Sequence, residues 1–235
     1  MTRIVPSTTA EFKSEKCKAV EAKEVGRLRG IKVWLEETVR EWASVCKDDD
    51  FDDAMSGRIF VIMGEKGSEM PDAKDKEIKA RAVFEGSRIF TKSGRPAAEL
   101  YQEIASSPST MVSTRASLAV SALTGGEATL CDAEQAYVQS SIRGPGRPSC
   151  WVRLPKAWWP KSWFDANGQP LYRDPVVLLD KALYGHPESG PLWDKHLGGI
   201  LKNESWTAID CVPGVWHHKE LCGILVVYVD DLMLV

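Results

Sequence analysis

Two adjacent carboxylates, Asp230 and Asp231, interrupt an apolar run that spans residues 221–235. The β-branched residues on either side predict a strand, a tight turn and a second strand, with the two acids at the hairpin tip. Two anions in an apolar setting repel each other and lose hydration, so they require protonation, a basic partner or a divalent cation. The cation is the alternative that supports catalysis.

A third carboxylate, Asp132, ends another strand-like segment at residues 128–132. Alternation along a strand places Asp132 on the same face as Ala128 and Leu130, at the end of an apolar row. An aspartate in this position is either the cap of a helix that begins at Ala133 or a ligand. Both interpretations are open on the residues alone.

Two cations, Lys79 and Arg81, lie two residues apart in a strand-like segment at 78–84, which follows a similar segment at 58–63 across a polar loop. The period of a strand places both cations on one face and the apolar residues Ile78, Ala80, Ala82 and Phe84 on the other. Neighbouring cations on the open face of a hairpin can grip a polyphosphate. Alternatively, they are solvent-facing charges that protect an edge strand from aggregation.

Aromatic and metal-ligating residues form two further clusters. Four of the nine tryptophans lie among cations at 151–163, where they either stack on bases or pack beneath a long loop. The six cysteines include no Cys-x-x-Cys pair, which favours reduced thiols over a disulfide framework. The second cluster consists of Cys211, His217, His218 and Cys222. These residues could form a zinc site, but a hairpin turn with two exposed histidines is the preferred interpretation.

The remaining pattern predicts the elements that position these residues. One or two amphipathic helices are expected at 12–45, then a flexible acidic linker at 48–53. A helix at 110–123 stops at Gly125-Gly126, and a strand at 176–179 precedes a helix with Ser189 as its cap and Pro191 in its first turn. This order predicts an α+β fold, an antiparallel sheet backed by helices.

The composition of the chain limits its class. Its 235 residues are 43% hydrophobic, which is sufficient for a core, and its net charge of −3 argues against an overall polycation. No apolar run approaches the roughly 20 residues of a membrane span, so no membrane association is expected. The first residues lack the apolar core of a signal peptide, so the protein is expected to remain inside the cell.

Four motifs, in this order, resemble those of the reverse transcriptases of copia-type LTR retrotransposons, which are right-handed-palm polymerases. The segment 78–81, Ile-Lys-Ala-Arg, resembles the fingers motif Tyr-Lys-Ala-Arg, and Asp132 opens a segment that resembles the first aspartate motif. Residues 181–185, Lys-Ala-Leu-Tyr-Gly, match a copia-type signature, with Trp193 where the family carries a tryptophan. Residues 228–231, Tyr-Val-Asp-Asp, resemble the Tyr-x-Asp-Asp box.

The resemblance implies an RNA-directed DNA polymerase that adds deoxynucleoside triphosphates to a primer on an RNA or DNA template. It implies magnesium, with manganese as an alternative ion, bound mainly by Asp132 and Asp230 and assisted by Asp231. By motif position, Lys79 and Arg81 contact the triphosphate, and Tyr137 is a gate that disfavours a ribose 2′-hydroxyl. Glu188 lies near the nucleotide, where the family commonly carries glutamine; its charge would repel the triphosphate unless compensated.

The resemblance also predicts how the chain is organised. Residues 1–56 are expected to form a helical lead-in, and residues 57–235 the fingers and palm, truncated within the second strand of the catalytic hairpin. The thumb is expected to be absent, and the remainder of a Gag-Pol-type polyprotein to complete the enzyme, which would reside in a cytoplasmic virus-like particle with a nuclear phase. The alternatives are an inactive transposon relic that binds nucleic acid, and a metal-dependent nuclease.

Overall fold

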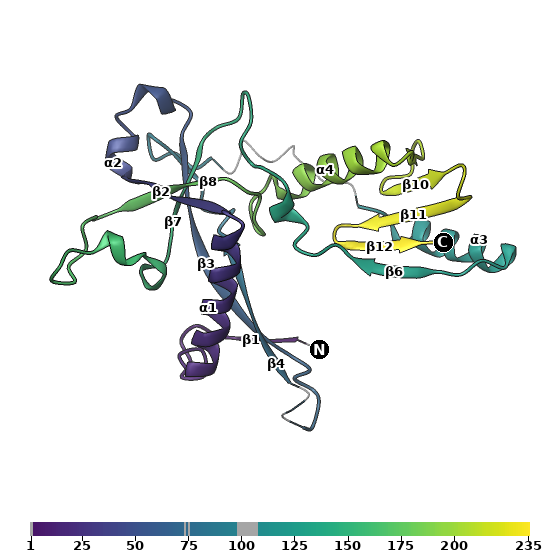
Figure 1. Cartoon of the computed structure of the whole chain (residues 1–235), viewed down its shortest axis with the longest axis horizontal. Coiled ribbons are helices and arrows are strands. Elements are labelled where there is room, and N and C mark those ends of the chain that lie inside the picture. The colour runs from purple at the N-terminus through teal and green to yellow at the C-terminus, as the bar shows by residue number, and fades with distance from the viewer. Residues whose placement is uncertain (1, 73, 75, 98–107) are drawn as a thin grey trace. The chain divides into compact units, whose positions relative to one another are not determined.

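The computed structural model describes residues 2–72, 74, 76–97 and 108–235, and it mixes helices with two β-sheets (Figure 1). The chain forms two compact units: unit 1 comprises Met1–Tyr101 and Ile142–His186, and unit 2 comprises Gln102–Ser141 and Pro187–Val235. The α and β content agrees with the predicted α+β class. The predicted boundary between residues 56 and 57 lies inside unit 1, which contains residues from both sides of it.

Unit 1 is built on a sheet in which β1, β3, β7, β8 and β2 are neighbours in that order, while β4 and β5 also pair with β3. The pairing of β3 with β7 is parallel and the other pairings are antiparallel. Its strands are β1 (Thr2–Val5), β2 (Trp34–Glu41), β3 (Met55–Lys66), β4 (Glu77–Phe84), β5 (Phe90–Thr91), β7 (Cys150–Arg153) and β8 (Pro175–Leu179). Its helices are α1 (Glu15–Gly30) and α2 (Trp42–Val45), with one-turn 3₁₀ helices η1 (Asp49–Phe51), η5 (Lys156–Trp158) and η6 (Lys161–Trp163).

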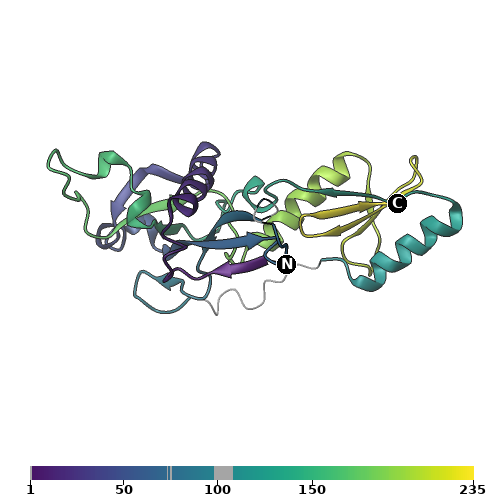
Figure 2. The same cartoon turned by 90° about the horizontal axis from the view of Figure 1, so that it is seen from below.

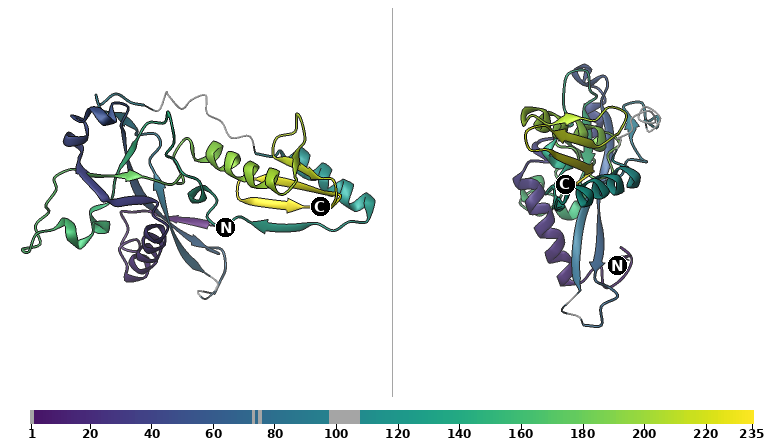
Figure 3. Two further views of the ribbon diagram at one scale, coloured as in Figure 1. Left: turned by 45° about the horizontal axis from the view of Figure 1, so that its top comes forward. Right: turned by 90° about the vertical axis from the view of Figure 1, so that its right-hand side faces the viewer.

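The predicted hairpin of the two strand-like segments is confirmed as β3 and β4, which pair from Ile59 with Phe84 to Lys66 with Glu77. The predicted alternation along β4 is confirmed too, because the side chains facing the core are apolar while Lys79 and Arg81 are exposed. Helix α1 runs beside β4 (Figure 3). Its Cys17 is fully buried in a cluster with Met63 and Ile78. The two cations therefore lie on the face of β4 opposite this cluster.

The N-terminal segment is part of this sheet rather than a separate helical lead-in. Helix α1 begins after Ser14, whose hydroxyl accepts a hydrogen bond from the Cys17 N–H, and it ends at Gly30. The helix predicted beyond this point is instead strand β2, which pairs with β8. The helix-like spacing of the tryptophans there was misleading, because β-branched Val33, Thr38 and Val39 favour a strand.

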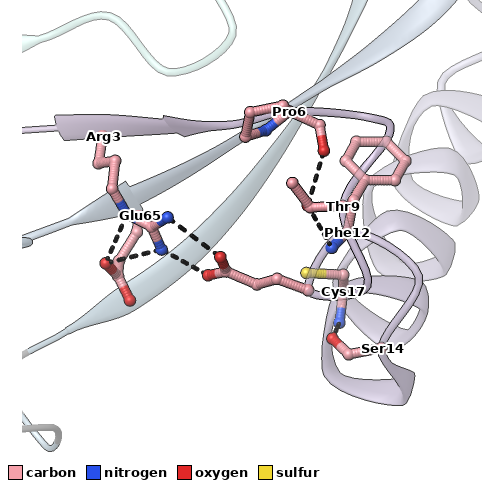
Figure 4. A network of polar contacts seen from close by, with 8 residues as sticks. Arg3, Pro6, Thr9, Phe12, Ser14, Cys17 and Glu65 are labelled. Atoms are coloured by element: carbon pink, nitrogen blue, oxygen red, sulfur yellow. Dashed lines mark hydrogen bonds and ion pairs between the residues drawn. The ribbon is translucent and has the colours of Figure 1, made fainter.

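A polar network holds the first strand to the start of α1 (Figure 4). The guanidinium of Arg3 lies between Glu65 of β3, at 3.2 Å, and Glu11, at 2.5 Å. The hydrogen bond from Arg3 lowers the pKa of Glu11 and raises that of Arg3 itself. The exposed guanidinium thus links the N-terminal segment to β3, which is distant from it in sequence.

The acidic segment at 48–53 is a structured turn, so the prediction of a flexible linker is wrong. The Asp48 carboxylate accepts a hydrogen bond from Arg40 at 2.7 Å and another from the N–H of Asp50, the second residue of η1. The bond from Arg40 is the main cause that lowers the pKa of Asp48. The ammonium of Lys92 also donates to the Asp48 carbonyl at 2.8 Å. Two cations thus hold the turn in place.

The tryptophans at 151–163 are packing residues for the most part. Trp151, Trp158 and Trp163 are at most 4% exposed, and Trp158 stacks on Trp34 of β2 with ring centroids 6.0 Å apart. Buried indoles cannot stack on bases. The interpretation of these three residues as padding beneath a loop is therefore confirmed.

Unit 2 is built on a second sheet, in which the strands are neighbours in the order β6, β12, β11, β10 and β9. Figure 2 shows α4 beside the hairpin of β11 and β12, where Trp193 and Leu197 of the helix pack against Leu225 and Val227. The strands are β6 (Thr129–Asp132), β9 (Thr207–Ala208), β10 (Val215–His218), β11 (Gly223–Tyr228) and β12 (Asp231–Leu234). The helices are α3 (Met111–Thr124), α4 (Ser189–Asn203) and the 3₁₀ turn η4 (Tyr137–Gln139).

The helix ends in unit 2 follow the predicted signals closely. Thr110 and Ser113 form a reciprocal capping box at the start of α3, and Gly125 adopts a left-handed φ of 72° at its end. Helix α4 starts one residue earlier than predicted, because Glu188 and not Ser189 occupies the cap position. The Glu188 side chain makes no cap hydrogen bond.

Within the described residues, no helix has the length and apolar character that crossing a bilayer requires.

Unit 1 is expected to lose stability as the pH falls from 7 to 5, because of its single histidine. His186 is 4% exposed and lies against Phe84, and burial, followed by the charge of Arg147, lowers its pKa to about 3. The unfolded chain takes up the proton near pH 6.5, so the stability present above that pH is lost as the pH falls towards 3. At pH 5 the expected loss is about 2 kcal/mol.

Urea unfolding followed by tryptophan fluorescence at pH 5, 6 and 7 measures this loss. The control is His186→Gln, which cannot titrate in this range. The difference between the two proteins should depend on pH. An equal pH dependence of the two proteins would show that His186 is not buried as a neutral imidazole.

Candidate functional site

The catalytic hairpin predicted from the sequence is formed by β11 and β12, joined by a two-residue turn of Val229 and Asp230. Tyr228 pairs with Asp231 across the hairpin, so Asp231 is the first residue of β12 and Asp230 lies in the turn itself. Val229 has a φ of +58°. A β-branched residue rarely adopts this left-handed conformation, which costs roughly 1–3 kcal/mol. The turn therefore needs support from its surroundings.

Helix α4 supplies this support through Trp193. The indole N–H of Trp193 donates a hydrogen bond to the Val229 carbonyl, with an N···O distance of 2.6 Å. Trp193 is only 2% exposed and belongs to the core between α4 and the hairpin. A buried indole with its N–H satisfied in this way fixes the carbonyl side of the turn. Sequence reasoning noted Trp193 but did not predict this contact.

The third aspartate is brought to the same end of the sheet by strand β6. β6 pairs with β12 in antiparallel register, with Asp132 directly opposite Asp231, and the N–H of Ala133 donates to the Asp230 carbonyl at 2.7 Å. Directly opposite residues in such a pair have Cβ atoms about 5 Å apart on the same face. Strand pairing thus brings together two aspartates that are about a hundred residues apart in sequence.

The alternative role of Asp132, a helix cap, does not fit the structure. A turn follows Asp132, and the next helical residue is Tyr137 in η4, whose cap position is occupied by Ala136. The predicted apolar row on β6 is not buried either, since Leu130 is 76% exposed. Asp132 is exposed, so its carboxylate is accessible to a ligand.

The arrangement differs from the predicted division of labour among the three aspartates. Asp231, which was expected to be auxiliary, is the residue opposite Asp132, whereas Asp230 occupies the turn. Among the described residues, no group of three or more His, Cys, Asp or Glu side chains is placed to hold a metal ion. The chemistry of the pair still fits magnesium, which is commonly held by one or two carboxylates together with substrate phosphates and water.

Tyr137 belongs to the same end of unit 2. It is half-buried against the core that contains Trp193 and Leu197. Burial raises the pKa of its phenol, and the charges of Asp230 and Asp194 raise it further. Tyr137 shares this core with Trp193, whose indole bonds the Val229 carbonyl, so its ring lies near the turn.

Glu188 is also in unit 2, at the cap position that precedes the first residue of α4. The partial positive charge of a helix N-terminus favours an anion. This helix end therefore offsets part of the cost of the extra carboxylate.

Lys79 and Arg81 belong to unit 1, where both lie on the exposed face of β4. The ammonium of Lys79 is 3.4 Å from a carboxylate oxygen of Glu77. The guanidinium of Arg81 instead lies over the ring of Tyr184, with its carbon 4.7 Å from the ring centroid. The two cations thus share a face but have different partners.

The Lys-Ala-Leu-Tyr-Gly segment at 181–185 attaches to the end of β4. The N–H of Phe84 donates to the Tyr184 carbonyl at 2.7 Å. Gly185 has a φ of +88°, and a Cβ atom there would lie 2.1 Å from the Phe84 carbonyl oxygen. This close approach requires glycine. The glycine of the motif was the sequence signal for such an attachment, although sequence reasoning did not use it.

The zinc interpretation of the cluster in β10 and its flanking turns finds no support. The buried His218 packs edge-on against Trp206, at 5.2 Å between ring centroids, and its Nδ1 accepts a hydrogen bond from the Leu221 N–H. Cys211 and Cys222 are exposed. The expected turn between β10 and β11 is present, but only His217 is exposed, so the prediction of two exposed histidines is wrong for His218.

Comparisons with protein-family models, with curated proteins and with solved structures found no match. The resemblance of the four motifs to reverse transcriptases therefore stays a prediction.

Proposed function

We propose that this chain carries the fingers and palm of an RNA-directed DNA polymerase of the copia-type retrotransposon class. The observation that carries the proposal is the pairing of Asp132 with Asp231, together with the bond from Ala133 to the Asp230 carbonyl. These contacts join two sequence motifs. One contributes Asp132 and the other contributes Asp230 and Asp231, and together they supply the carboxylates that the chemistry requires. On this proposal unit 2 contains the palm, and unit 1 contains the fingers.

Asp132, Asp230 and Asp231 would hold divalent ions, magnesium or manganese. When bound, such ions lower the pKa of the primer 3′-hydroxyl and neutralise charge on the departing pyrophosphate. The chain contributes the position of the carboxylates: strand pairing sets Asp132 against Asp231, and Trp193 holds the turn that carries Asp230. The exposure of Asp132 and Asp231 leaves both carboxylates accessible to a substrate.

The other predicted residues would bind the nucleotide. Lys79 and Arg81 would contact the triphosphate of the incoming deoxynucleotide from the exposed face of β4. Tyr137 would contact its sugar and disfavour a 2′-hydroxyl. Glu188 adds a negative charge, which its position at the N-terminus of α4 partly compensates.

The proposal implies the partners of a retrotransposon polymerase. These are an RNA or DNA template with a primer, deoxynucleoside triphosphates and the remainder of a Gag-Pol-type polyprotein. A cytoplasmic virus-like particle and a nuclear phase follow from the same class.

Primer extension tests the proposal. A DNA primer annealed to an RNA template is offered with deoxynucleotides and magnesium to this chain and to a form extended beyond Val235. Ion binding is measured separately, from the loss of the free Mn²⁺ signal in electron paramagnetic resonance. Magnesium-dependent extension and saturable Mn²⁺ binding are expected.

The alternative functions are distinguished in the same assays. Salt-sensitive binding of the primer–template without extension by either form would identify a non-catalytic nucleic-acid-binding relic. Magnesium-dependent cleavage of a strand would identify a nuclease. Either result would contradict the polymerase proposal.

A further inference from the structure

The backbone of Tyr184 is held in place on both sides of the residue. Its carbonyl accepts the hydrogen bond from Phe84, and the following residue, Gly185, fits against the Phe84 carbonyl in a conformation that only glycine adopts easily. The residues before it, Ala182 and Leu183, are almost fully buried. Tyr184 is therefore a fixed aromatic surface beside the exposed face of β4.

Arg81 uses this surface through the flat face of its guanidinium. Stacking occupies the face of the group and leaves the N–H donors, which lie in its plane, directed outwards. A carboxylate partner would have the opposite effect, because it would occupy those donors and neutralise the charge. Lys79, two residues away, is close to such a partner in Glu77. Arg81 is thus the better prepared of the two cations for binding a phosphate.

We propose that Tyr184 is the positioning residue for Arg81: its ring holds the guanidinium on the face of β4 with the donors directed outwards, where they can bind a polyphosphate. This rests on the proposed function, in which Arg81 contacts the nucleotide triphosphate. It assigns a role to the tyrosine of the Lys-Ala-Leu-Tyr-Gly segment that is separate from metal binding. The ring, and not the hydroxyl, performs the role.

The test compares Tyr184→Leu with Tyr184→Phe in the full chain, with inorganic tripolyphosphate as the probe. Isothermal titration calorimetry is expected to show affinity about twofold to fivefold weaker for Tyr184→Leu, the range of an exposed cation–π contact, and unchanged affinity for Tyr184→Phe. In primer extension, Tyr184→Leu should raise KM for the deoxynucleotide with little change in kcat. Circular dichroism establishes that both variants are folded.

A double-mutant cycle separates positioning from general damage. Arg81→Ala should weaken tripolyphosphate binding in the wild-type background and have little further effect in Tyr184→Leu. Lys79→Ala is the matched control, since it should weaken binding to the same degree in both backgrounds. Additive effects of Arg81→Ala and Tyr184→Leu would overturn the positioning role.

The outcomes also distinguish this inference from the proposed function. The upfield ring-current shift of the Arg81 side-chain protons in NMR, lost in Tyr184→Leu and kept in Tyr184→Phe, tests the stacking without any ligand. Tripolyphosphate binding that is equal in all Tyr184 variants would overturn the inference alone. Absence of tripolyphosphate binding by the wild-type chain, with the ring-current shift intact, would overturn both the inference and the nucleotide role of Arg81.

Discussion

Asp132→Asn is expected to lower magnesium-dependent primer extension by about 10²–10³-fold, the effect of removing one preorganised charged group from a catalytic centre. That factor corresponds to about 3–4 kcal/mol of transition-state stabilisation. The same change should leave unit 2 folded. It should even raise its free energy of unfolding by about 0.2–1 kcal/mol, because Asp132 lies directly opposite Asp231 and like charges in that position repel.

The opposite signs of the two effects make the result specific. A variant that loses activity by misfolding would be less stable, not more. Asp210→Asn is the matched control, since it removes the same charge from an exposed residue of unit 2 that lies away from the hairpin in sequence. Extension is measured in whichever form of the chain extends the primer, and stability by urea unfolding. Full activity of Asp132→Asn would show that Asp132 binds no catalytic ion.

Gly185→Ala is expected to destabilise unit 1 by about 2–5 kcal/mol. A left-handed conformation costs an L-residue about 1–2 kcal/mol, and forcing extra atoms into a packed site costs about 1–3 kcal/mol more. Here the added Cβ would meet the Phe84 carbonyl oxygen at 2.1 Å and the side chain of Val83 at 2.8 Å. Phe84 is 1% exposed, so it has little room to move.

The chain contains a matched control for this prediction in Gly94. Gly94 also belongs to unit 1 and has a φ of +78°, but a Cβ atom there would meet nothing within 4 Å. Gly94→Ala should therefore cost only the conformational part, about 1–2 kcal/mol. Urea unfolding of both variants gives the difference, which measures the contact with Phe84. Equal losses would mean that residues 181–185 do not press against β4.

The elements that were predicted well are those with a strong local signal. The hairpin of β3 and β4 has a period of two, and α3 has both a capping residue and a terminal glycine. Strand β2 was missed because two tryptophans and a valine happened to fall at helical spacing. Its β-branched residues and its pairing with β8 decided the outcome, and that pairing cannot be read from a local pattern.

The approach of Asp132 to the Asp230-Asp231 pair was predicted from the sequence, but the register between their strands was not. The order of the motifs indicated that Asp132 would approach the Asp230-Asp231 pair, and strand pairing places them together. Register decides which aspartate faces which, and one residue of register moves a side chain to the other face of a strand. The sequence alone could not determine that register, so it could not indicate that Asp231, and not Asp230, lies opposite Asp132.

The contacts that hold the site were the least predictable. The bond from Trp193 to Val229 and the stacking of Arg81 on Tyr184 each join segments that are far apart in the chain. Nothing in the spacing of these residues indicates which aromatic side chain meets which turn or cation. They depend on the packing of whole elements.

The bond from Trp193 ends on a main-chain carbonyl, a group that every amino acid possesses. The contact with α4 therefore requires a particular backbone conformation at residue 229 and not a particular side chain. Position 229 is open to exchange by residues that tolerate a positive φ, with glycine and asparagine the best suited. The hydrogen bond therefore allows the side chain at position 229 of Tyr-Val-Asp-Asp to vary, whereas it requires the indole of Trp193.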